Sequence, residues 1–514
     1  IAIVGCGFTG TTALHQLVHH YPVEKITVFE AGEAFGPGFP YSPTETPDYL
    51  INNTNDTMCL EPTNRQAFVE WLRNHDRYSH SLDEGGHMPR AVYGEFLVDT
   101  IRRCQQIADQ KSIVLDFVHE ACADIEEHDD HSVTLHWRGG MTDADRVILA
   151  TGRCPDIDAF GLDGEENYFA THMPGSHLAP LPLDAEVHVI GASLSAYDVV
   201  NLIFSPDTGA SFEAAAPGKL RFVPGPNQRR VILCSRSGRL KKAQSRYPGK
   251  VLRRHFNAEA IESMAERGTS LEQIIDLMIA DAEDNGVLVK PDLVKYPYAG
   301  CRNVEDVTAR AAELLAFDIT EALSPDTGAN FMVDYLADAQ FDIWDLFAKK
   351  KLTEQDELRY RQLIESPYLC WGAPCPIPTA QKILALIEAG RLRILAGTRS
   401  ITAGDDGIFA IEHEFGIEPA TIIVNATGAV NRDVESPGQP ELVRNLVRRG
   451  LIRPYRLGGD KSPGAAVDMA SYRCEGATSI FAVNMLLWGP GHFTSSAIAM
   501  ATSVRDLLEG IFRG

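Results

Sequence analysis

The sequence predicts an α/β fold with two Rossmann-like dinucleotide-binding domains and a mainly helical insertion. Three observations predict it: a glycine-rich strand-turn-helix unit at residues 1–30, a similar unit at residues 186–236, and helix-type patterning between about residues 250 and 370. A strand that runs through a glycine turn into a helix is the repeating element of nucleotide-binding α/β sheets. We therefore expect one domain for each glycine unit, with the helical segment inserted within or beside the second.

The first unit opens the chain as IAIVGCGFTGTTALHQL, residues 1–17. An expected buried strand is followed by Gly5, Gly7 and Gly10, which have the spacing G-x-G-x-x-G, and then by an expected helix. In such a turn the first glycine permits the tight bend and the second lets the backbone approach a pyrophosphate. The third glycine lets the helix pack closely on the strand.

The start of this helix, which includes Phe8 and Thr9, should offer free N–H groups and the positive end of the helix dipole to phosphates. A second apolar strand, residues 26–29, ends in Glu30. An acid at this strand end accepts hydrogen bonds from a ribose diol and disfavours a 2′-phosphate. The first unit is therefore expected to hold FAD or NAD rather than NADP.

The second unit, EVHVIGASLSAYDVV (residues 186–200), repeats the pattern with a single glycine. Ser193 and Ala196 stand where the second and third glycines would be, and both are small enough for a close approach of the helix. The residues expected to contact a second nucleotide are Gly191, Ser193, Leu194 and Ser195.

The next expected strand, residues 231–234, ends in Ser235 and Arg236, where the first unit ends in Glu30. A basic residue with a hydroxyl neighbour suits a 2′-phosphate, so we expect NADPH here; the alternative is a solvated basic loop. Two units of opposite preference indicate a flavoprotein that holds FAD in the first unit and is reduced by NADPH in the second.

Two strings, RVILATGRCP (residues 146–155) and TIIVNATGAV (residues 421–430), each end an apolar strand in Ala-Thr-Gly. Such turns mark crossings between the FAD and NAD(P) domains of two-dinucleotide flavoproteins. The residues expected to contact cofactor there are Thr151, Gly152, Thr427 and Gly428. The expected domains are 1–160 (FAD, first part), 180–398 (NADPH, with the helical insertion at about 250–370) and 399–514 (FAD, second part).

The composition excludes several classes of function. The 514 residues carry a formal net charge of -23, whereas nucleic-acid and anionic-membrane binding need a basic face. No apolar run approaches the roughly 18 residues that span a bilayer, and no secretory signal is visible. The cysteines are scattered, as expected for reduced thiols in a cytoplasm, and the pair in CWGAPC (Cys370 and Cys375) is expected to be unlinked. The oligomeric state stays open, a homo-oligomer included.

Several strings together resemble a known family: GCGFTG, GPGFPYS (residues 36–42), YLINNTNDTMCLEP (49–62), PRAVYGEFL (89–97) and SRSGRL (235–240). Over nearly its whole length the chain resembles the bacterial FAD-NAD(P)-binding flavoproteins of the two-dinucleotide type. Their characterised relatives include amino-acid N-hydroxylating monooxygenases, among them enzymes that oxidise aspartate to nitrosuccinate. The resemblance implies that NADPH reduces FAD, that O₂ then forms a C4a-hydroperoxyflavin, and that one oxygen passes to an amine. The cofactor carries this chemistry, so neither a metal ion nor a catalytic triad is expected.

On the flavin side, Gly36 and Gly38 should let the backbone pass close to FAD. Asn52 and Asn53 are expected to hydrogen-bond the edge of the flavin ring, with Met58 packed near it. Arg90 either meets the FAD phosphates or pairs with a surface acid; the sequence does not separate these two roles.

Near the end of the chain, GPGHFTSSAIAMATSVRDLL (residues 489–508) predicts a glycine turn that feeds a long helix. Its start, with Phe493 and Thr494, is expected to face the flavin and to stabilise negative charge on it. His492 is a candidate for tuning the flavin or a substrate proton; the alternative is a hydrogen-bonded turn histidine.

The substrate is expected to be a small amine or amino acid, acidic ones such as aspartate included, with O₂ as the second substrate. Cations that could hold a carboxylate lie between the units, at Arg246, Lys250 and Arg302. The alternative function is an NAD(P)H-dependent flavin oxidoreductase that inserts no oxygen, because both functions need the same two domains.

Overall fold

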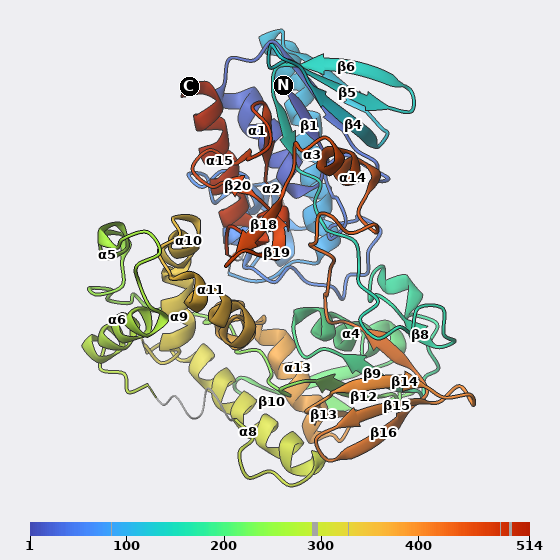
Figure 1. Cartoon of the computed structure of the whole chain (residues 1–514). Coiled ribbons are helices and arrows are strands. Elements are labelled where there is room, and N and C mark those ends of the chain that lie inside the picture. Colours follow the sequence, from blue (N-terminus) through green and yellow to red (C-terminus); the bar gives the residue numbers. More distant parts are fainter. Residues whose placement is uncertain (84, 290–296, 327, 484, 493–495, 514) are drawn as a thin grey trace.

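The computed structural model describes residues 1–83, 85–289, 297–326, 328–483, 485–492 and 496–513. It is a mixed α/β fold with two large sheets, as predicted, and a group of helices beside them (Figure 1). Phe493 and Thr494, expected at the flavin, lie outside the described residues. Within the described part of the chain, no helix combines the length and the apolar character needed to cross a membrane.

The first unit is built on a seven-stranded sheet in the order β20-β21-β22-β7-β1-β2-β3. β3, β2, β1, β7 and β22 run parallel, and β20 and β21 extend the sheet antiparallel. The strands are β1 (Ala2–Val4), β2 (Lys25–Phe29), β3 (Val114–Val118), β7 (Val147–Leu149), β20 (Val467–Asp468), β21 (Arg473–Cys474) and β22 (Ile480–Ala482). Their buried runs of valine, isoleucine and leucine are typical of a sheet covered on both faces.

Helices cover this sheet and close its core. α1 packs against α3 and α15, so the N-terminal and C-terminal parts of the chain share one core. The helices of this unit are α1 (Phe8–His20), α2 (Ala67–Asn74), α3 (Arg90–Lys111), α14 (Glu441–Arg448) and α15 (Ala497–Arg513). A two-stranded ribbon, β18 (Pro454–Leu457) and β19 (Asp460–Ala465), packs through β19 on the short helical turn Met485–Trp488.

The second unit is built on a five-stranded parallel sheet in the order β13-β12-β9-β17-β8. Its strands are β8 (Tyr168–Phe169), β9 (Glu186–Ile190), β12 (Arg230–Ser235), β13 (Leu392–Ala396) and β17 (Ile423–Asn425). Three helices, α4 (Leu194–Ile203), α8 (Val304–Leu323) and α13 (Ile377–Glu388), pack their apolar residues into its core. A hairpin of β10 (Ser211–Ala216) and β11 (Lys219–Val223) packs on α13.

The two units repeat one topology. The order β3-β2-β1-β7 of the first sheet corresponds to β13-β12-β9-β17 of the second. A three-stranded antiparallel sheet precedes the last strand of each series. These sheets are β4 (Cys122–Glu127), β5 (Val133–Trp137) and β6 (Gly140–Ala144) in the first unit, and β14 (Ser400–Ala403), β15 (Phe409–His413) and β16 (Gly416–Ala420) in the second.

The chain returns to the first unit later than expected. We expected the second FAD part to begin at residue 399, but β14–β16 pack on the second sheet, and β17 pairs with β9. Val430 and Val434 are the first residues after β17 that join the core of the first unit. The expectation failed because the antiparallel strands after β13 look alike in either unit. The turns at residues 150–152 and 426–428 do lie where the chain leaves each unit.

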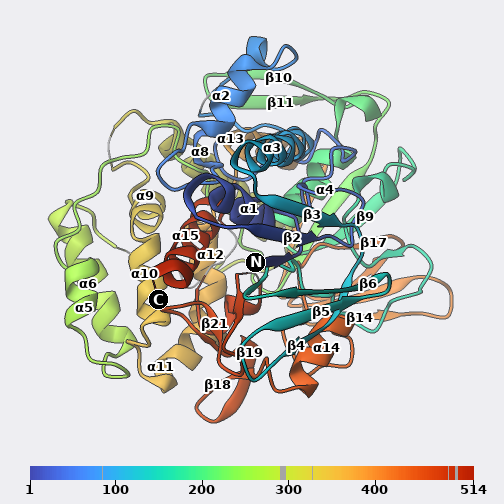
Figure 2. The same cartoon turned by 90° about the horizontal axis from the view of Figure 1, so that it is seen from above.

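The expected helical segment divides between two cores. α8 belongs to the core of the second unit, whereas the other helices form a core of their own at one side of the molecule (Figures 1 and 2). These helices are α5 (Ala258–Ser263), α6 (Leu271–Asp284), α9 (Phe331–Asp338), α10 (Gln340–Ala348), α11 (Glu354–Arg359) and α12 (Glu365–Gly372). A π-helical turn, Tyr360–Ile364, joins α11 to α12.

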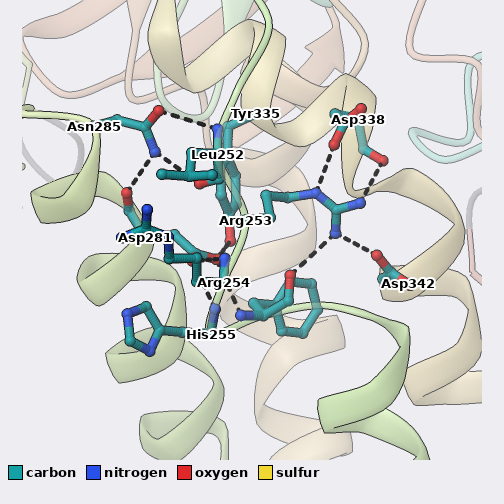
Figure 3. Close-up of polar contacts among 10 residues, drawn as sticks. Leu252, Arg253, Arg254, His255, Asp281, Asn285, Tyr335, Asp338 and Asp342 are labelled. Carbon is teal, nitrogen blue, oxygen red and sulfur yellow. Dashed lines mark hydrogen bonds and ion pairs between the residues drawn. The ribbon is translucent and has the colours of Figure 1, made fainter.

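A buried carboxylate organises this helical core. Asp281 of α6 is 0% exposed, and it accepts N–H bonds from Arg254 (2.7 Å), His255 (2.8 Å) and Phe256 (3.0 Å) and the Tyr335 hydroxyl bond (2.8 Å) (Figure 3). Burial opposes its ionisation, but these donors hold the pKa of Asp281 below its usual value. Three consecutive amides are thereby satisfied by one side chain, which fixes the loop before α5 against α6 and α9.

Replacing Asp281 by asparagine should lower the unfolding free energy by about 1–3 kcal/mol, because at least one buried amide loses its acceptor. The matched control is Asp284→Asn, three residues along the same helix, where a partly exposed carboxylate pairs with Arg254 at 3.4 Å. The Asp284→Asn substitution should lower the unfolding free energy by no more than about 0.5 kcal/mol. Chemical denaturation measures both.

The pH dependence follows from the lowered pKa of Asp281. The contribution of Asp281 to the free energy of unfolding is fully present above the pKa of its carboxyl in the unfolded chain, near 3.8. This contribution is lost as the pH falls through the lower pKa of the folded protein. The difference between parent and Asp281→Asn should therefore stay constant from about pH 5 to pH 8. If Asp281→Asn and Asp284→Asn lowered the unfolding free energy by the same amount, the organising role of Asp281 would be contradicted.

Candidate functional site

A cavity of about 1320 Å³ lies along the first unit's glycine turn and extends to the second unit. Four groups of first-unit residues line it: the glycine turn, the end of β2, the segment 37–44 and the first Ala-Thr-Gly turn. Ser195 and Gly428 of the second unit complete it. Nine predicted cofactor residues of the first unit line this cavity: Gly5, Gly7, Phe8, Thr9, Glu30, Gly38, Arg90, Thr151 and Gly152.

The glycine turn is closed by contacts that only glycine permits. Gly5 has a φ of +94°, and a Cβ there would lie 2.4 Å from the Ala150 carbonyl oxygen. A Cβ on Gly10 would lie 2.0 Å from the Gly5 oxygen, and one on Gly38 would lie 2.8 Å from the Gly7 Cα. Strand, helix and the segment containing Gly38 therefore meet through bare backbone, which leaves a smooth wall for a pyrophosphate.

The N-terminus of α1 faces this wall without a described cap. Gly7 is the N-cap residue and contributes no side chain, so the first N–H groups of the helix are open to a ligand. An apposed helix terminus, a bare glycine turn and an elongated cavity are the features that a dinucleotide requires. The residues present thus fit FAD.

Glu30 lies at the end of β2, on the cavity wall, as predicted. Its carboxylate accepts an N–H bond from Cys6 (2.7 Å) and another from Gly32 (2.7 Å). These bonds hold the two oxygens in place while each oxygen keeps a further lone pair. Glu30 is thereby positioned to accept hydrogen bonds from a ribose diol.

The second glycine turn reproduces the first. Gly191 has a φ of +129°, and a Cβ there would lie 2.7 Å from the Ala426 carbonyl oxygen. Gly5 approaches the Ala150 carbonyl oxygen in the same way. The Gly191 N–H donates to Cys234 (2.7 Å), as that of Gly5 donates to Phe29 (2.9 Å). α4 begins at Leu194 after the N-cap Ser193, and no described side chain caps it. The start of α4 is therefore left open in the same way as the start of α1.

At the edge of this second turn, Arg236 follows the carboxyl end of β12 and is exposed. No side-chain partner is found for it in the described part of the chain. The Ser235 hydroxyl accepts the Gly238 N–H (2.9 Å), and the Thr427 hydroxyl donates to Asn425 (2.8 Å). Arg236 is thus placed at the sheet edge where α/β sheets bind ligands, and its role toward NADPH stays a prediction.

Arg90 pairs with an acid, although that acid is buried and not on the surface as expected, and its contact with the FAD phosphates stays a prediction. It lines the cavity from the first position of α3, and its Nη2 donates to Asp198 of α4 at 2.6 Å. Burial raises the pKa of Asp198 to about 6, although Arg90 opposes that rise. His172 lies 3.9 Å from the same carboxylate, and burial lowers its pKa to about 3. A buried ion pair therefore joins the two units beside the cavity.

Four candidate flavin contacts, Met58, Asn52, Asn53 and Gly36, lie outside the cavity wall. Met58 is buried in an apolar cluster between α2, α3 and the start of α15. Asn52 and Asn53 lie in the adjoining loop, where His87 Nδ1 lies 3.0 Å from the backbone carbonyl oxygen of Asn53. Gly36, with a φ of +118°, lets the chain pass the backbone of Leu97 in α3. Their proposed flavin contacts stay predictions.

His492 lies in an aromatic pocket and not on the cavity wall. Its Nε2 lies 2.6 Å from the Tyr360 hydroxyl, and its ring stacks on Phe347 with the centroids 4.7 Å apart. Burial lowers its pKa to about 3, so the ring is neutral. Arg361 of the same π-helical turn donates to the Gly489 carbonyl (2.5 Å) and the Gly491 carbonyl (3.2 Å). The helical segment thus holds the turn that leads to α15.

A cation that was not predicted from the sequence, Arg432, lies next to this turn. The guanidinium of Arg432 lies 4.2 Å from the Trp488 ring centroid, and its buried Nε has no hydrogen-bond partner among the described residues. Burial lowers the pKa of Arg432, while Cys154 on the cavity wall and Glu365 of α12 act to raise it. Arg432 follows the second Ala-Thr-Gly turn by four residues, and that position was the available signal.

The three cations proposed from the sequence lie elsewhere. Arg246 forms an ion pair with Asp83 at 3.0 Å. Lys250 and Arg302 are exposed, and Arg302 donates its backbone N–H to Asp306. The structure does not bring these three cations together at one site.

Comparisons with known proteins agree with this architecture. Residues 2–154 match a family model described as FAD-NAD(P)-binding. The chain is 24% identical over 518 residues to the uncharacterized protein YdhS of Escherichia coli (strain K12), which covers 95% of this chain and 92% of that protein.

Solved structures resemble the whole chain at low identity. An ornithine N-hydroxylase from Kutzneria sp. 744 gives a TM-score of 0.53 at 13% identity, covering 100% of this chain and 98% of that one. The structure of L-lysine 6-monooxygenase from Pseudomonas syringae gives a TM-score of 0.52 at 15% identity, again covering 100% of this chain and 98% of that one. Residues 2–154 thus match an FAD-NAD(P)-binding family model, and the whole chain shares the fold of these two solved structures.

Proposed function

We propose that this chain is an NADPH-dependent FAD monooxygenase that hydroxylates the amine nitrogen of a small amino acid, with aspartate as the first candidate. One observation carries the proposal: a cavity of about 1320 Å³ runs along the first glycine turn and reaches Ser195 and Gly428, which flank the second glycine turn. A binding protein for a single nucleotide has no use for the second turn. Two facing nucleotide sites are what hydride transfer between two cofactors needs.

The first unit would hold FAD through its own backbone and one acid. The open N–H groups of α1 bind the pyrophosphate, and Glu30 binds the adenosine ribose. When bound, FAD would accept hydride and, once reduced, activate O₂. The chain orients it between the glycine turn and the segment containing Gly38.

The second unit would hold NADPH with its nicotinamide toward the same cavity. The N-terminus of α4 binds the pyrophosphate, and Arg236 pairs with the 2′-phosphate. Ser195, in the first turn of α4, and Gly428 both line the cavity, so the second unit reaches the flavin site directly. The Arg90–Asp198 ion pair holds α4 beside α3.

Arg432 and Glu365 would hold the two charged groups of an amino acid. The planar guanidinium of Arg432 binds a carboxylate with two hydrogen bonds, and stacking on Trp488 fixes its plane. Glu365, whose pKa burial raises, accepts a hydrogen bond from the amine and favours its neutral, nucleophilic form by taking its proton. The similar solved structures include an ornithine N-hydroxylase described with reduced FAD, NADP⁺ and L-ornithine, which is an amine substrate with a carboxylate.

The overall reaction consumes one NADPH, one proton and one O₂ for each amine, and gives NADP⁺, water and the hydroxylamine. A dry site favours this outcome, because water leads the reduced flavin and O₂ to peroxide instead. Arg361 and the His492 aromatic pocket hold the turn before α15 against the helical core, which closes that side of the molecule.

Replacing Arg236 by alanine should raise the KM for NADPH roughly ten- to hundredfold, because a charge-assisted bond to a 2′-phosphate contributes about 1.5–3 kcal/mol. The KM for NADH should stay nearly unchanged. The matched control is Arg230→Ala at the opposite end of β12, where an exposed arginine pairs with Glu186 at 3.3 Å. Equal losses with both cofactors would assign Arg236 a structural role.

Incubation with NADPH, O₂ and a panel of amino acids tests the substrate assignment. Aspartate should stimulate NADPH consumption and yield a hydroxylamine, nitroso or nitro product in mass spectrometry. Arg432→Ala should raise the KM for the amino acid by roughly tenfold or more, and Arg432→Lys should restore part of it, since a bidentate contact is lost in both. Arg456→Ala, on the exposed β18–β19 ribbon, is the control.

Two outcomes would contradict the proposal. Peroxide formation with every amino acid, at a rate independent of the amine, would indicate a flavin oxidoreductase without oxygen insertion. If NADPH oxidation were coupled to product formation with a ketone and with no amino acid, the monooxygenase function would stand. The amino-acid substrate and the substrate-binding role of Arg432 would then be wrong.

A further inference from the structure

We propose that His15, His19 and Glu61 form a binding site for a divalent metal ion of the Zn²⁺ class at the C-terminal end of α1. One ligand atom from each of the three side chains lies within 4.8 Å of the other two. Two imidazoles and a carboxylate are a donor set that zinc takes in proteins, with a water completing the tetrahedron. No catalytic metal was expected from the sequence, and this site lies apart from the cavity.

The histidines present one face of the helix. His15 and His19 are four residues apart, which brings side chains together on an α-helix, and their ring centroids are 4.1 Å apart. The Nδ1 of His19 lies 2.7 Å from the His15 carbonyl oxygen. A carbonyl only accepts, so Nδ1 carries the hydrogen and Nε2 of His19 keeps its lone pair. Metal-binding histidines are commonly held in this way by a carbonyl on the other nitrogen.

Glu61 is held opposite this face. Its Oε1 lies 2.8 Å from His15 Nε2 and 2.9 Å from His20 Nε2. The preceding residue is fixed to the same helix, because the Gln16 amide donates to the Leu60 carbonyl at 2.8 Å and to the Ala501 carbonyl at 3.2 Å. The carboxylate therefore needs no large movement to share a metal with the imidazoles.

The surroundings favour a transition metal over calcium or magnesium. Those ions prefer six or more oxygen ligands, whereas nitrogen ligands predominate here. Lys111, which lies at this end of α1, donates its ammonium hydrogens to the Val18 and His19 carbonyls. His15 and Glu61 are about one-fifth exposed (21% and 17%), so an ion can enter from solvent.

A bound ion would tie α1 to the segment that runs into α2. The opposite end of α1 faces the cavity, so the ion would act on stability rather than on chemistry. The proposal stands independently of the proposed function.

The test uses the full chain without a histidine tag, stripped with EDTA and titrated with ZnCl₂ by calorimetry. One Zn²⁺ should bind per chain, and the melting temperature should rise. Co²⁺ at the same site should give the visible absorption of a tetrahedral complex. His15→Gln and His19→Gln should each weaken binding roughly tenfold or more.

The matched control is His255→Gln, which removes an exposed histidine that lies 3.4 Å from Asp284 but has no second histidine beside it. This variant should bind Zn²⁺ as the parent does. Melting without metal checks that each variant is folded. Absence of saturable one-to-one binding, or binding unchanged in the doubly substituted His15→Gln, His19→Gln chain, would overturn the proposal.

Discussion

The architecture depends on one backbone contact, made twice. In each unit the first glycine of the turn packs against the alanine carbonyl that begins an Ala-Thr-Gly turn, at a distance that excludes any Cβ. The Ala150 N–H donates to Val4 (2.8 Å), and the Ala426 N–H donates to Ile190 (2.9 Å), so the same ladder continues past both strand ends. Because each Ala-Thr-Gly turn also carries the chain between the units, this contact fixes the nucleotide turn and the crossing together.

The two units are joined by more than these crossings. The Arg90–Asp198 pair links α3 to α4 with both side chains buried, and such a pair resists separation because either charge alone would be costly to bury. On the other side, Arg361 binds the carbonyls of the turn before α15, and Tyr360 meets His492. The helical core stabilised by Asp281 therefore supports the C-terminal turn.

Local patterns were sufficient to predict the two glycine turns and the position of Glu30, because spacing along a single strand-turn-helix determines them. The point of return to the first unit was wrong, because β14–β16 carry no local mark of the sheet they join. Contacts between distant residues were not predictable either: Asp198 is 108 residues from Arg90, and Glu61 is 42 residues beyond His19. Arg432 was overlooked because its burial beside Trp488 comes from tertiary packing and from no periodicity.

The central claim is that two nucleotides meet in one cavity, and anaerobic reduction tests it most directly. The protein is reconstituted with FAD, freed of unbound flavin and titrated with NADPH in the absence of O₂ while the visible flavin absorbance is recorded. We predict that about one equivalent of NADPH removes this absorbance, and that NADH at the same concentration acts more slowly. A protein that retains FAD but stays oxidised in excess NADPH would contradict the account.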